Sequence, residues 1–207
     1  MRRRLMTAIA VLAAALTFVP AALAATLLID GSFERPRTNV LKVFPTGSSL
    51  RHCESGAIGC WLVTAGELDL VPSSVWLPDN GSQSVELNGG ARAATIAQAF
   101  GATEGATYRV SFYLAGNPAW QGGTLMKLQV SCEDIDTHGN TLSITTKNFT
   151  FDTTGKTPTD MGWTKHSFRV TSVPGTIQGR LFFISQTDVG DSDLGPAVDR
   201  AVVAQVG

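Results

Sequence analysis

Apolar and polar residues alternate between residues 107 and 115, and this alternation constrains the fold more than any other feature of the chain. The apolar set is Tyr108, Val110, Phe112 and Leu114, and the intervening polar set is Arg109, Ser111 and Tyr113. A period of two is typical of a half-buried β-strand, and aromatic and β-branched residues suit its pleated surface. Gly105-Ala106 before the run and Gly116-Asn117-Pro118 after it mark turns. We therefore expect a central strand of a β-sandwich here.

Short runs with strand character recur along the rest of the chain. They cover residues 26–29, 61–63, 68–71, 83–87, 94–100, 125–130, 141–151, 163–170, 181–184 and 197–203. Turn signals such as Asp79-Asn80-Gly81 and His138-Gly139-Asn140 separate them. Residues 35–59, rich in proline, arginine and serine, are predicted to form a surface loop. About ten short strands without a helical pattern predict an all-β sandwich or jelly roll.

The N-terminus has the pattern of an export signal. Three arginines follow Met1, an apolar run covers residues 5–19, and Ala22-Leu23-Ala24 resembles a cleavage site. A membrane anchor is the alternative, but the apolar run is short for a span. We expect a signal peptide over residues 1–24 and one domain over residues 25–207, secreted to the periplasm or the extracellular space. No later run is long enough to predict a membrane span.

Charge bears on the class of partner, and cysteine content on the disulfides. The formal net charge is −1 and no basic cluster occurs, which argues against nucleic acid as a partner. The cysteines are Cys53, Cys60 and Cys132. The spacing of Cys53 and Cys60 permits a local disulfide in an exported protein, although spacing alone does not fix the pairing. Cys132 is predicted to be a buried free thiol.

Several motifs together resemble a known family. They are Asp30-Gly31-Ser32-Phe33-Glu34, residues 82–89, residues 108–112 with 115–118, residues 151–156 with 161–163, and Gly195-Pro196-Ala197-Val198-Asp199. Across residues 27–203 the chain resembles the bacterial choice-of-anchor C family, which is similar to the plant cell-wall family called domain of unknown function 642. The resemblance implies a galactose-binding-like jelly roll, of the kind found in carbohydrate-binding modules, at a cell surface. Because residues 203–207 contain no anchoring tail, we expect release rather than anchoring.

The resemblance also implies one structural Ca²⁺ ion. In similar jelly rolls, a glutamate of the opening motif and an aspartate of the last strand hold Ca²⁺ with backbone carbonyls. Carried over to this chain, the metal ligands are Glu34 and Asp199, whose carboxylates are the hard oxygen donors that Ca²⁺ prefers. The alternative is that Asp199 pairs with Arg200, and Glu34 with Arg35 or Arg37.

Two tryptophans in loop-like segments suggest a sugar site, because sugar rings stack on aromatic faces while their hydroxyls bind polar groups. The residues predicted to bind carbohydrate are Trp76, Asp79, Asn80, Asn117 and Trp120. The alternative is that Trp76 and Trp120 cover the ends of the core. Trp61 and Trp163 stand in strand patterns and are expected in the core.

Catalytic motifs are missing from the sequence. It contains no G-x-S-x-G, no H-E-x-x-H and no P-loop. A glycosidase needs two carboxylates, for which Glu67 with Asp69 or Asp134 with Asp136 come into question, although both pairs also suit surface charge. We expect an exported, non-enzymatic polysaccharide-binding protein. The alternatives are a structural or adhesive matrix protein that contacts other proteins, and a glycoside or ester hydrolase.

Overall fold

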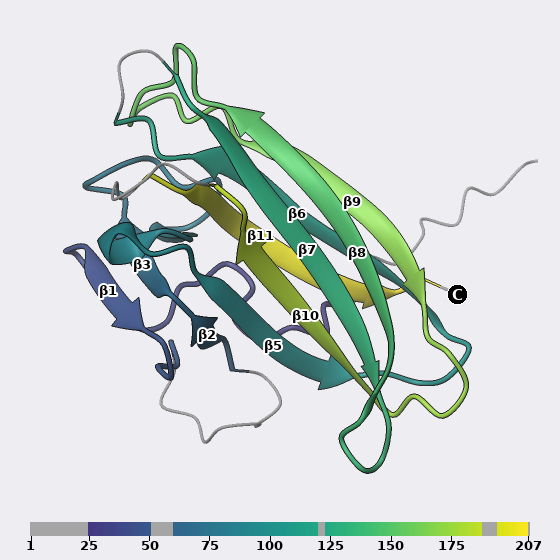
Figure 1. Cartoon of the computed structure of the whole chain (residues 1–207). Helices are drawn as coiled ribbons and strands as arrows, with labels where there is room; N and C mark the ends of the chain where they lie inside the picture. Colours follow the sequence, from purple (N-terminus) through teal and green to yellow (C-terminus); the bar gives the residue numbers. More distant parts are fainter. Residues whose placement is uncertain (1–24, 51–59, 120–122, 188–193, 207) are drawn as a thin grey trace, which may run out of the picture.

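Two antiparallel sheets make up the molecule (Figure 1). The computed structural model describes residues 25–50, 60–119, 123–187 and 194–206. The six-stranded sheet has the order β1 (Lys42–Pro45), β3 (Glu67–Pro72), β4 (Gln83–Glu86), β11 (Pro196–Gln205), β6 (Thr107–Gly116) and β9 (Thr164–Thr171). The five-stranded sheet has the order β2 (Leu62–Ala65), β5 (Thr95–Gly101), β10 (Gln178–Ser185), β7 (Leu125–Ile135) and β8 (Thr141–Asp152). One 3₁₀ turn, η1 (Gly89–Ala91), follows β4. The predicted all-β sandwich is confirmed.

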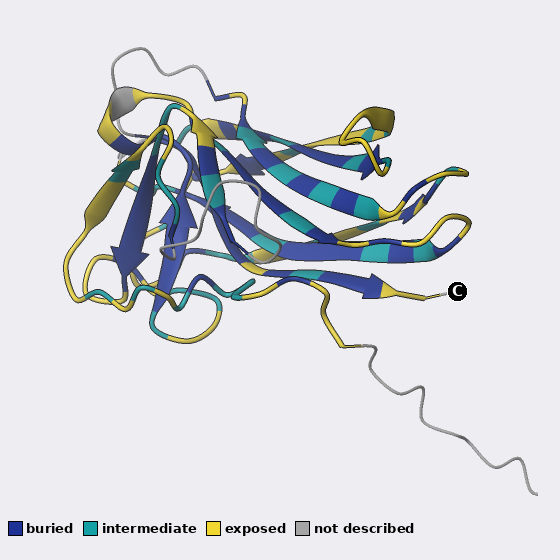
Figure 2. Ribbon diagram, turned by 90° about the horizontal axis from the view of Figure 1, so that it is seen from below, coloured by how far each residue is buried: buried dark blue, intermediate teal, exposed yellow. Residues whose placement is uncertain are grey.

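Strand β6 has the predicted alternation. Tyr108 is 1% exposed and Val110, Phe112 and Leu114 are fully buried, whereas Arg109 and Tyr113 are only partly buried. β6 lies between β11 and β9, with Leu114 opposite Val198 in one neighbour and Thr164 in the other. The apolar face of β6 therefore forms one side of the core between the two sheets (Figure 2).

A chain of aromatic rings links the layers through the core. The ring centre of Phe33, in the N-terminal segment, lies 5.1 Å from that of Trp61, and the ring centre of Trp61 lies 5.7 Å from that of Phe183 in β10. Phe183 in turn lies 5.2 Å from Phe112 of β6. Trp61 is 1% exposed, and its indole N–H donates to the carbonyl of Asp30 at 3.1 Å. This confirms the prediction that Trp61 is a core residue. Trp163, also expected in the core, is partly buried and packs against its edge.

The first and last segments of the described chain lie side by side. Leu27 donates its amide to the carbonyl of Val203 at 2.7 Å, and Ala201 donates to the carbonyl of Gly31 at 2.7 Å. A side chain at Gly31 would collide with the backbone of Ala201, so this approach requires glycine. The start of the domain is thus held along β11.

Two predictions about the N-terminal region are wrong. Residues 26–29 do not form a strand, and residues 27–30 are bends. Leu27 bonds to β11, but the backbone N–H and C=O of Ile29 bind the side-chain amide of Gln98 at 2.7 and 2.9 Å, so no strand ladder continues. Conversely, the predicted loop of residues 35–59 contains β1. β1 is a short edge strand with Val43 48% exposed, so its sequence lacks the buried alternation that identifies a strand.

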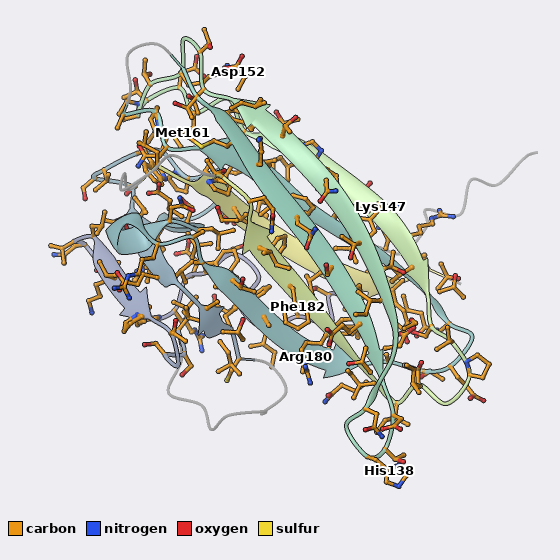
Figure 3. The ribbon with its side chains drawn as sticks, in the orientation of Figure 1. His138, Lys147, Asp152, Met161, Arg180 and Phe182 are labelled. Atoms are coloured by element: carbon orange, nitrogen blue, oxygen red, sulfur yellow. The ribbon has the colours of Figure 1, made fainter. Side chains whose placement is uncertain are left out.

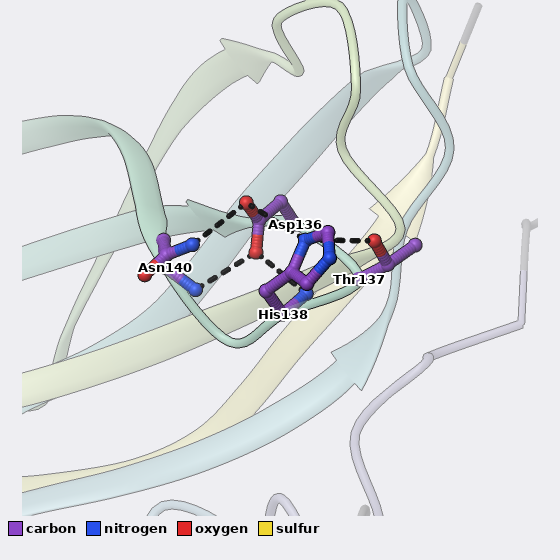
Figure 4. Close-up of polar contacts among 4 residues, drawn as sticks. All are labelled: Asp136, Thr137, His138 and Asn140. Atoms are coloured by element: carbon purple, nitrogen blue, oxygen red, sulfur yellow. Dashed lines mark hydrogen bonds and ion pairs between the residues drawn. The ribbon is translucent and has the colours of Figure 1, made fainter.

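The β7–β8 connection confirms the turn predicted at residues 138–140 (Figure 4). One carboxylate oxygen of Asp136 accepts the backbone N–H groups of His138 and Asn140, both at 2.8 Å, and the other accepts the Asn140 side-chain amide at 3.0 Å. These bonds, led by the Asn140 side chain, lower the pKa of Asp136. Asp134 accepts the Ser143 hydroxyl at 2.6 Å. Asp134 and Asp136, one of the two carboxylate pairs considered for hydrolysis, thus both have structural partners.

We predict that the stability of the protein falls in acid, because the His166 ring of β9 packs against Phe149 of β8. The His166 ring lies 4.9 Å from Phe149 and 5.6 Å from Phe112, and burial lowers its pKa. Burial favours the neutral ring in the folded state. The contribution of His166 to the free energy of unfolding is therefore complete above pH ~6.5 and is lost as the pH falls through the lowered folded-state pKa. We expect His166→Phe to reduce the drop in melting temperature between pH 7.5 and 5.

The control for this measurement is His138→Phe, because the His138 side chain is 82% exposed. It should melt like the wild type at both pH values. Equal acid sensitivity in the wild type and in His166→Phe would contradict the assignment.

Candidate functional site

A pocket of about 360 Å³ opens over β3 and β4, which we call the carboxylate pocket. Its floor residues, Asp69 and Glu86, alternate along these strands with the fully buried Leu70 and Val85, so they occupy the sheet face directed away from the core. The lining residues are Leu41, Val43, Asp69, Val75, Trp76, Glu86, Gly90, Asn117, Pro118, Ala119 and Pro158. The pocket thus combines a polar floor with apolar walls.

The floor consists of two carboxylates that lie side by side on neighbouring strands. Asp69 and Glu86 are direct partners across the β3–β4 ladder and are 4% and 1% exposed. The Asn117 side-chain amide lies 3.0 and 3.1 Å from the two oxygens of Glu86, and the Gly195 N–H donates to one of them at 2.7 Å. Burying a carboxylate is costly unless donors satisfy it, and these donors hold Glu86 in one orientation.

Two loops are fixed in place to build one wall. Trp76 is 3% exposed, and its indole N–H donates to the Ser84 hydroxyl at 2.9 Å. The next residue, Leu77, accepts from the Trp163 indole at 2.9 Å and donates its own amide to Pro158 at 2.8 Å. The wall therefore has a defined position before any ligand arrives.

The rest of the rim is apolar and open to solvent. Leu41, Val43 and Val75 are 44%, 48% and 40% exposed. On the floor, a side chain at Gly89 would come within 2.5 Å of the Asp69 carboxylate, so the glycine keeps this carboxylate in place. An apolar rim above a few oriented polar groups is the usual composition of a small-molecule site.

The residues predicted to bind sugar divide between two places. Trp76 and Asn117 both line the carboxylate pocket, whereas Asp79 and Asn80 lie at the turn before β4. Trp120 lies outside the described residues. Trp76 belongs to the core, so it contributes a buried wall rather than the open aromatic platform expected of a loop tryptophan.

Asp69 and Glu86 escaped the sequence analysis as a pair. The signal available was an acidic residue next to a buried apolar one in each strand, Asp69 beside Leu70 and Glu86 beside Val85. Only the strand register shows that they face each other.

The two predicted calcium ligands meet at the turn before β4. Glu34 accepts the Ser82 N–H at 2.9 Å and the Ser82 hydroxyl at 2.6 Å. Asp199, fully buried, accepts the N–H groups of Asn80 at 2.9 Å and Arg200 at 2.6 Å. Burial raises the pKa of Asp199 to about 7, despite these hydrogen bonds, and the nearby negative charges of Asp79 and Glu34 add to the effect.

The alternative ion pairs predicted for this region do not form. The Arg200 guanidinium lies 3.0 Å from Asp79 and 5.0 Å from the centre of the Tyr113 ring, while Glu34 binds Ser82. Within the described ranges, no group of three or more His, Cys, Asp and Glu side chains could hold a metal ion. A Ca²⁺ ion on Glu34 and Asp199 would therefore need backbone carbonyls or water as its further ligands. The carboxylates fit such an ion, because it would compensate a buried negative charge.

A second surface carries an aromatic side chain on the outer face of the five-stranded sheet (Figure 3). The run 181–184, predicted to be buried, instead alternates, and Phe182 is half-buried on the outer face. It lies between Ala97 of β5 and Ser131 of β7, with the Arg180 guanidinium 5.9 Å from its ring centre. The sequence missed this because four consecutive apolar residues hide the alternation.

Two of the three cysteines, Cys60 and Cys132, lie within the described residues. Cys132 is a free cysteine, as predicted, and burial raises its pKa to about 12. Cys60 is 3% exposed, but Cys53 lies outside the described residues, so their pairing stays a prediction. In the same described segments, no helix has the length and apolarity needed to cross a membrane.

Comparison with known proteins decides the family. The family model described as a protein of unknown function (DUF642) matches residues 26–204. The chain belongs to the DUF642 family. This DUF642 protein is also 28% identical over 109 residues to halomucin of Haloquadratum walsbyi, covering 51% of this chain but only 1% of halomucin.

Solved structures similar to this DUF642 protein include carbohydrate-binding modules. The CBM22-1 xylan-binding domain of Paenibacillus barcinonensis Xyn10C is 15% identical, with a TM-score of 0.46, covering 79% of this chain and 97% of that domain. TmCBM61, solved with β-1,4-galactotriose, is 16% identical, with a TM-score of 0.47, covering 88% and 100%. The active domain of bacteriophage CBA120 tailspike protein 4 scores 0.43 at 12% identity, covering 87% of this chain and 21% of that one. At these sequence identities and TM-scores, the similarity to these structures does not indicate a function.

Proposed function

We propose that this protein binds carbohydrate in the carboxylate pocket without transforming it. The observation that carries the proposal is the placement of the Asn117 amide and the Asp69 and Glu86 carboxylates beneath apolar walls. Sugar hydroxyls need such acceptors and donors, and the C–H faces of a sugar ring suit apolar side chains. The polar groups are already oriented by the sheet and by Gly195, so little ordering is needed on binding.

The arrangement supports binding rather than hydrolysis. Glycosidases place their two carboxyl groups on either side of the scissile bond. Asp69 and Glu86 instead stand side by side on one floor, as direct cross-strand partners. A sugar ring above them meets both carboxylates from the same side. We propose a non-enzymatic role outside the cytoplasm, as the signal-like N-terminus predicts.

Binding of the purified protein to a glycan array tests this proposal. We expect saturable binding that falls at least tenfold in Asn117→Ala, because the donor to Glu86 is lost. Phe182→Ala is the matched control, since it removes an aromatic side chain from the other exposed face without touching the pocket. A flat array would contradict the proposal and favour a matrix protein that contacts other proteins. Binding lost only in Phe182→Ala would move the site to the five-stranded sheet.

We also propose one structural Ca²⁺ ion on Glu34 and Asp199. A cation there would join the N-terminal segment to β11 and neutralise buried charge, so a chelator should lower the melting temperature. Glu34→Gln and Asp199→Asn should melt at the same temperature with and without chelator. Glu133→Gln, which removes a carboxylate from the β7–β10 ion pair, should keep the chelator effect. A wild-type protein unaffected by chelator would rule out the ion.

A further inference from the structure

Strand pairing assembles a group of cations on the outer face of the six-stranded sheet, where β6 and β9 lie side by side (Figure 1). Arg109 of β6 and Arg169 of β9 are direct cross-strand partners. Arg109 alternates with the buried Tyr108, so this pair projects away from the core. Further along the same face, Lys165 is opposite Tyr113, with its Nζ 6.0 Å from the ring centre. Because these cations come from two separate stretches of sequence, no basic run marks them.

The two arginine side chains are held close together. The neighbouring pair on the same face, Thr107 and Thr171, has its hydroxyl oxygens 3.0 Å apart. The pair type in an antiparallel ladder repeats every two residues, so Arg109 and Arg169 occupy the same kind of position. Cβ atoms at such positions are about 4.5–5.5 Å apart. Since an arginine side chain is always charged, two positive charges stand next to each other here.

These cations have no acidic partner among the residues that the structure describes. Arg109, Arg169 and Lys165 take part in none of the ion pairs formed there. The positions between them on the same face are the neutral Ser111 and Ser167. Like charges directly opposite each other destabilise a sheet. An anion bound between the two arginines would remove this repulsion, so the pair is suited to a negatively charged ligand.

The shape and polarity of the face indicate the kind of anion. The arginine pair and Lys165 are four residues apart along the ladder, about 13 Å at about 3.3 Å per residue. In the described chain, no exposed large apolar side chain lies on β6 or β9, whereas membrane-binding surfaces combine cations with exposed apolar groups. Cations spaced by hydroxyl groups along a flat face suit an extended polymer that carries both negative charges and hydroxyls.

We propose that the outer face of β6 and β9 binds an acidic polysaccharide whose sugars carry carboxylate groups. One carboxylate would lie between Arg109 and Arg169, because guanidinium groups bind carboxylates through paired, charge-assisted hydrogen bonds. A second carboxylate of the same polymer would meet Lys165, and Ser111 and Ser167 would bind sugar hydroxyls between them. This surface is separate from the carboxylate pocket over β3 and β4, so the inference goes beyond the proposed function.

Two ligands that differ only in charge give the first test. Alginate oligomers and their methyl esters of equal length share one backbone, but esterification removes the negative charges. Titration calorimetry with the purified protein at low salt should show at least tenfold tighter binding of the acid form. The preference should shrink as sodium chloride is raised, because salt screens interactions between exposed charges. Equal binding of the acid and the ester would contradict the proposal.

A double variant, Arg109→Gln with Arg169→Gln, tests the position of the site. It should bind alginate at least tenfold more weakly than the wild type. Without ligand it should melt no lower than the wild type, because the change removes a repulsion between like charges. Alginate should raise the melting temperature of the wild type and leave that of the double variant nearly unchanged.

The matched control is Lys127→Gln, which removes a positive charge from the outer face of the other sheet, where Lys127 is exposed and opposite Thr150. It should bind alginate like the wild type, and a loss as large as that of the double variant would show that only overall charge matters. Asn117→Ala, which changes the carboxylate pocket, should also keep alginate binding. A loss confined to Asn117→Ala would place the acidic ligand in that pocket and overturn this inference.

Other polyanions are the remaining outcomes of the test. Tighter binding of a single-stranded DNA oligonucleotide of equal charge, or of vesicles of phosphatidylglycerol and phosphatidylcholine, would overturn the assignment to a polysaccharide. The proposed function fails separately. If neutral glycans do not bind but alginate binds and depends on the arginine pair, the carboxylate pocket is not a sugar site and this inference stands.

Discussion

Replacing Trp61 by alanine is expected to lower the free energy of unfolding by about 3–5 kcal/mol. Trp61 is 1% exposed and lies between Phe33 and Phe183, so its removal opens a cavity where the N-terminal segment meets β10. The variant also loses the hydrogen bond from the indole to Asp30. Denaturant titration followed by circular dichroism measures the change.

Trp163→Ala is the matched control for this prediction. Trp163 also donates its indole N–H to a backbone carbonyl, that of Leu77, but it is only partly buried at the edge of the core. We expect it to cost clearly less stability than Trp61→Ala. Equal losses in the two variants would contradict the view that Trp61 joins the opening segment to the sandwich.

Replacing Glu86 by glutamine is expected to reduce sugar binding at least tenfold while the protein still folds. The side chain keeps its shape, but its new N–H₂ group faces the amide of Asn117 or the N–H of Gly195, which are themselves donors. A buried group without a suitable partner costs about 1–3 kcal/mol, so a moderate loss of stability should accompany the binding defect. Calorimetry with the glycan identified on the array measures the first effect and denaturant titration the second.

Glu104→Gln makes the same chemical change outside the pocket, where the carboxylate accepts the exposed backbone N–H of Gly175 at 2.8 Å. It should bind the glycan like the wild type. If Glu86→Gln binds as tightly as Glu104→Gln, the floor of the pocket takes no part in recognition.

Local patterns were enough to predict the layers of this fold. The alternation along β6, the turn at residues 138–140 and the core position of Trp61 all follow from sequence and are confirmed. The pattern failed where long-range partners replace local ones. Residues 26–29 resemble a strand but bind the Gln98 side chain, and β1 is an exposed edge whose sequence resembles a loop.

The candidate site was only half predictable, because it depends on strand register. Asn117 and Trp76 stood out as polar and aromatic residues near turns, and they do line one pocket. Asp69 and Glu86 each resemble an ordinary strand residue until β3 and β4 pair and bring them together. Asp79 and Asn80 were grouped with the sugar site by nearness in sequence, but the fold places them beside Asp199 and Arg200.

The most direct test of carbohydrate binding in the carboxylate pocket follows backbone and side-chain amide resonances by nuclear magnetic resonance while a glycan that binds on the array is added to the protein. We predict that the largest chemical-shift changes occur at Gly89, Gly195 and the Asn117 side chain, which surround the two carboxylates. Changes confined to the strands around Phe182, or no changes at saturating ligand concentrations, would contradict the account.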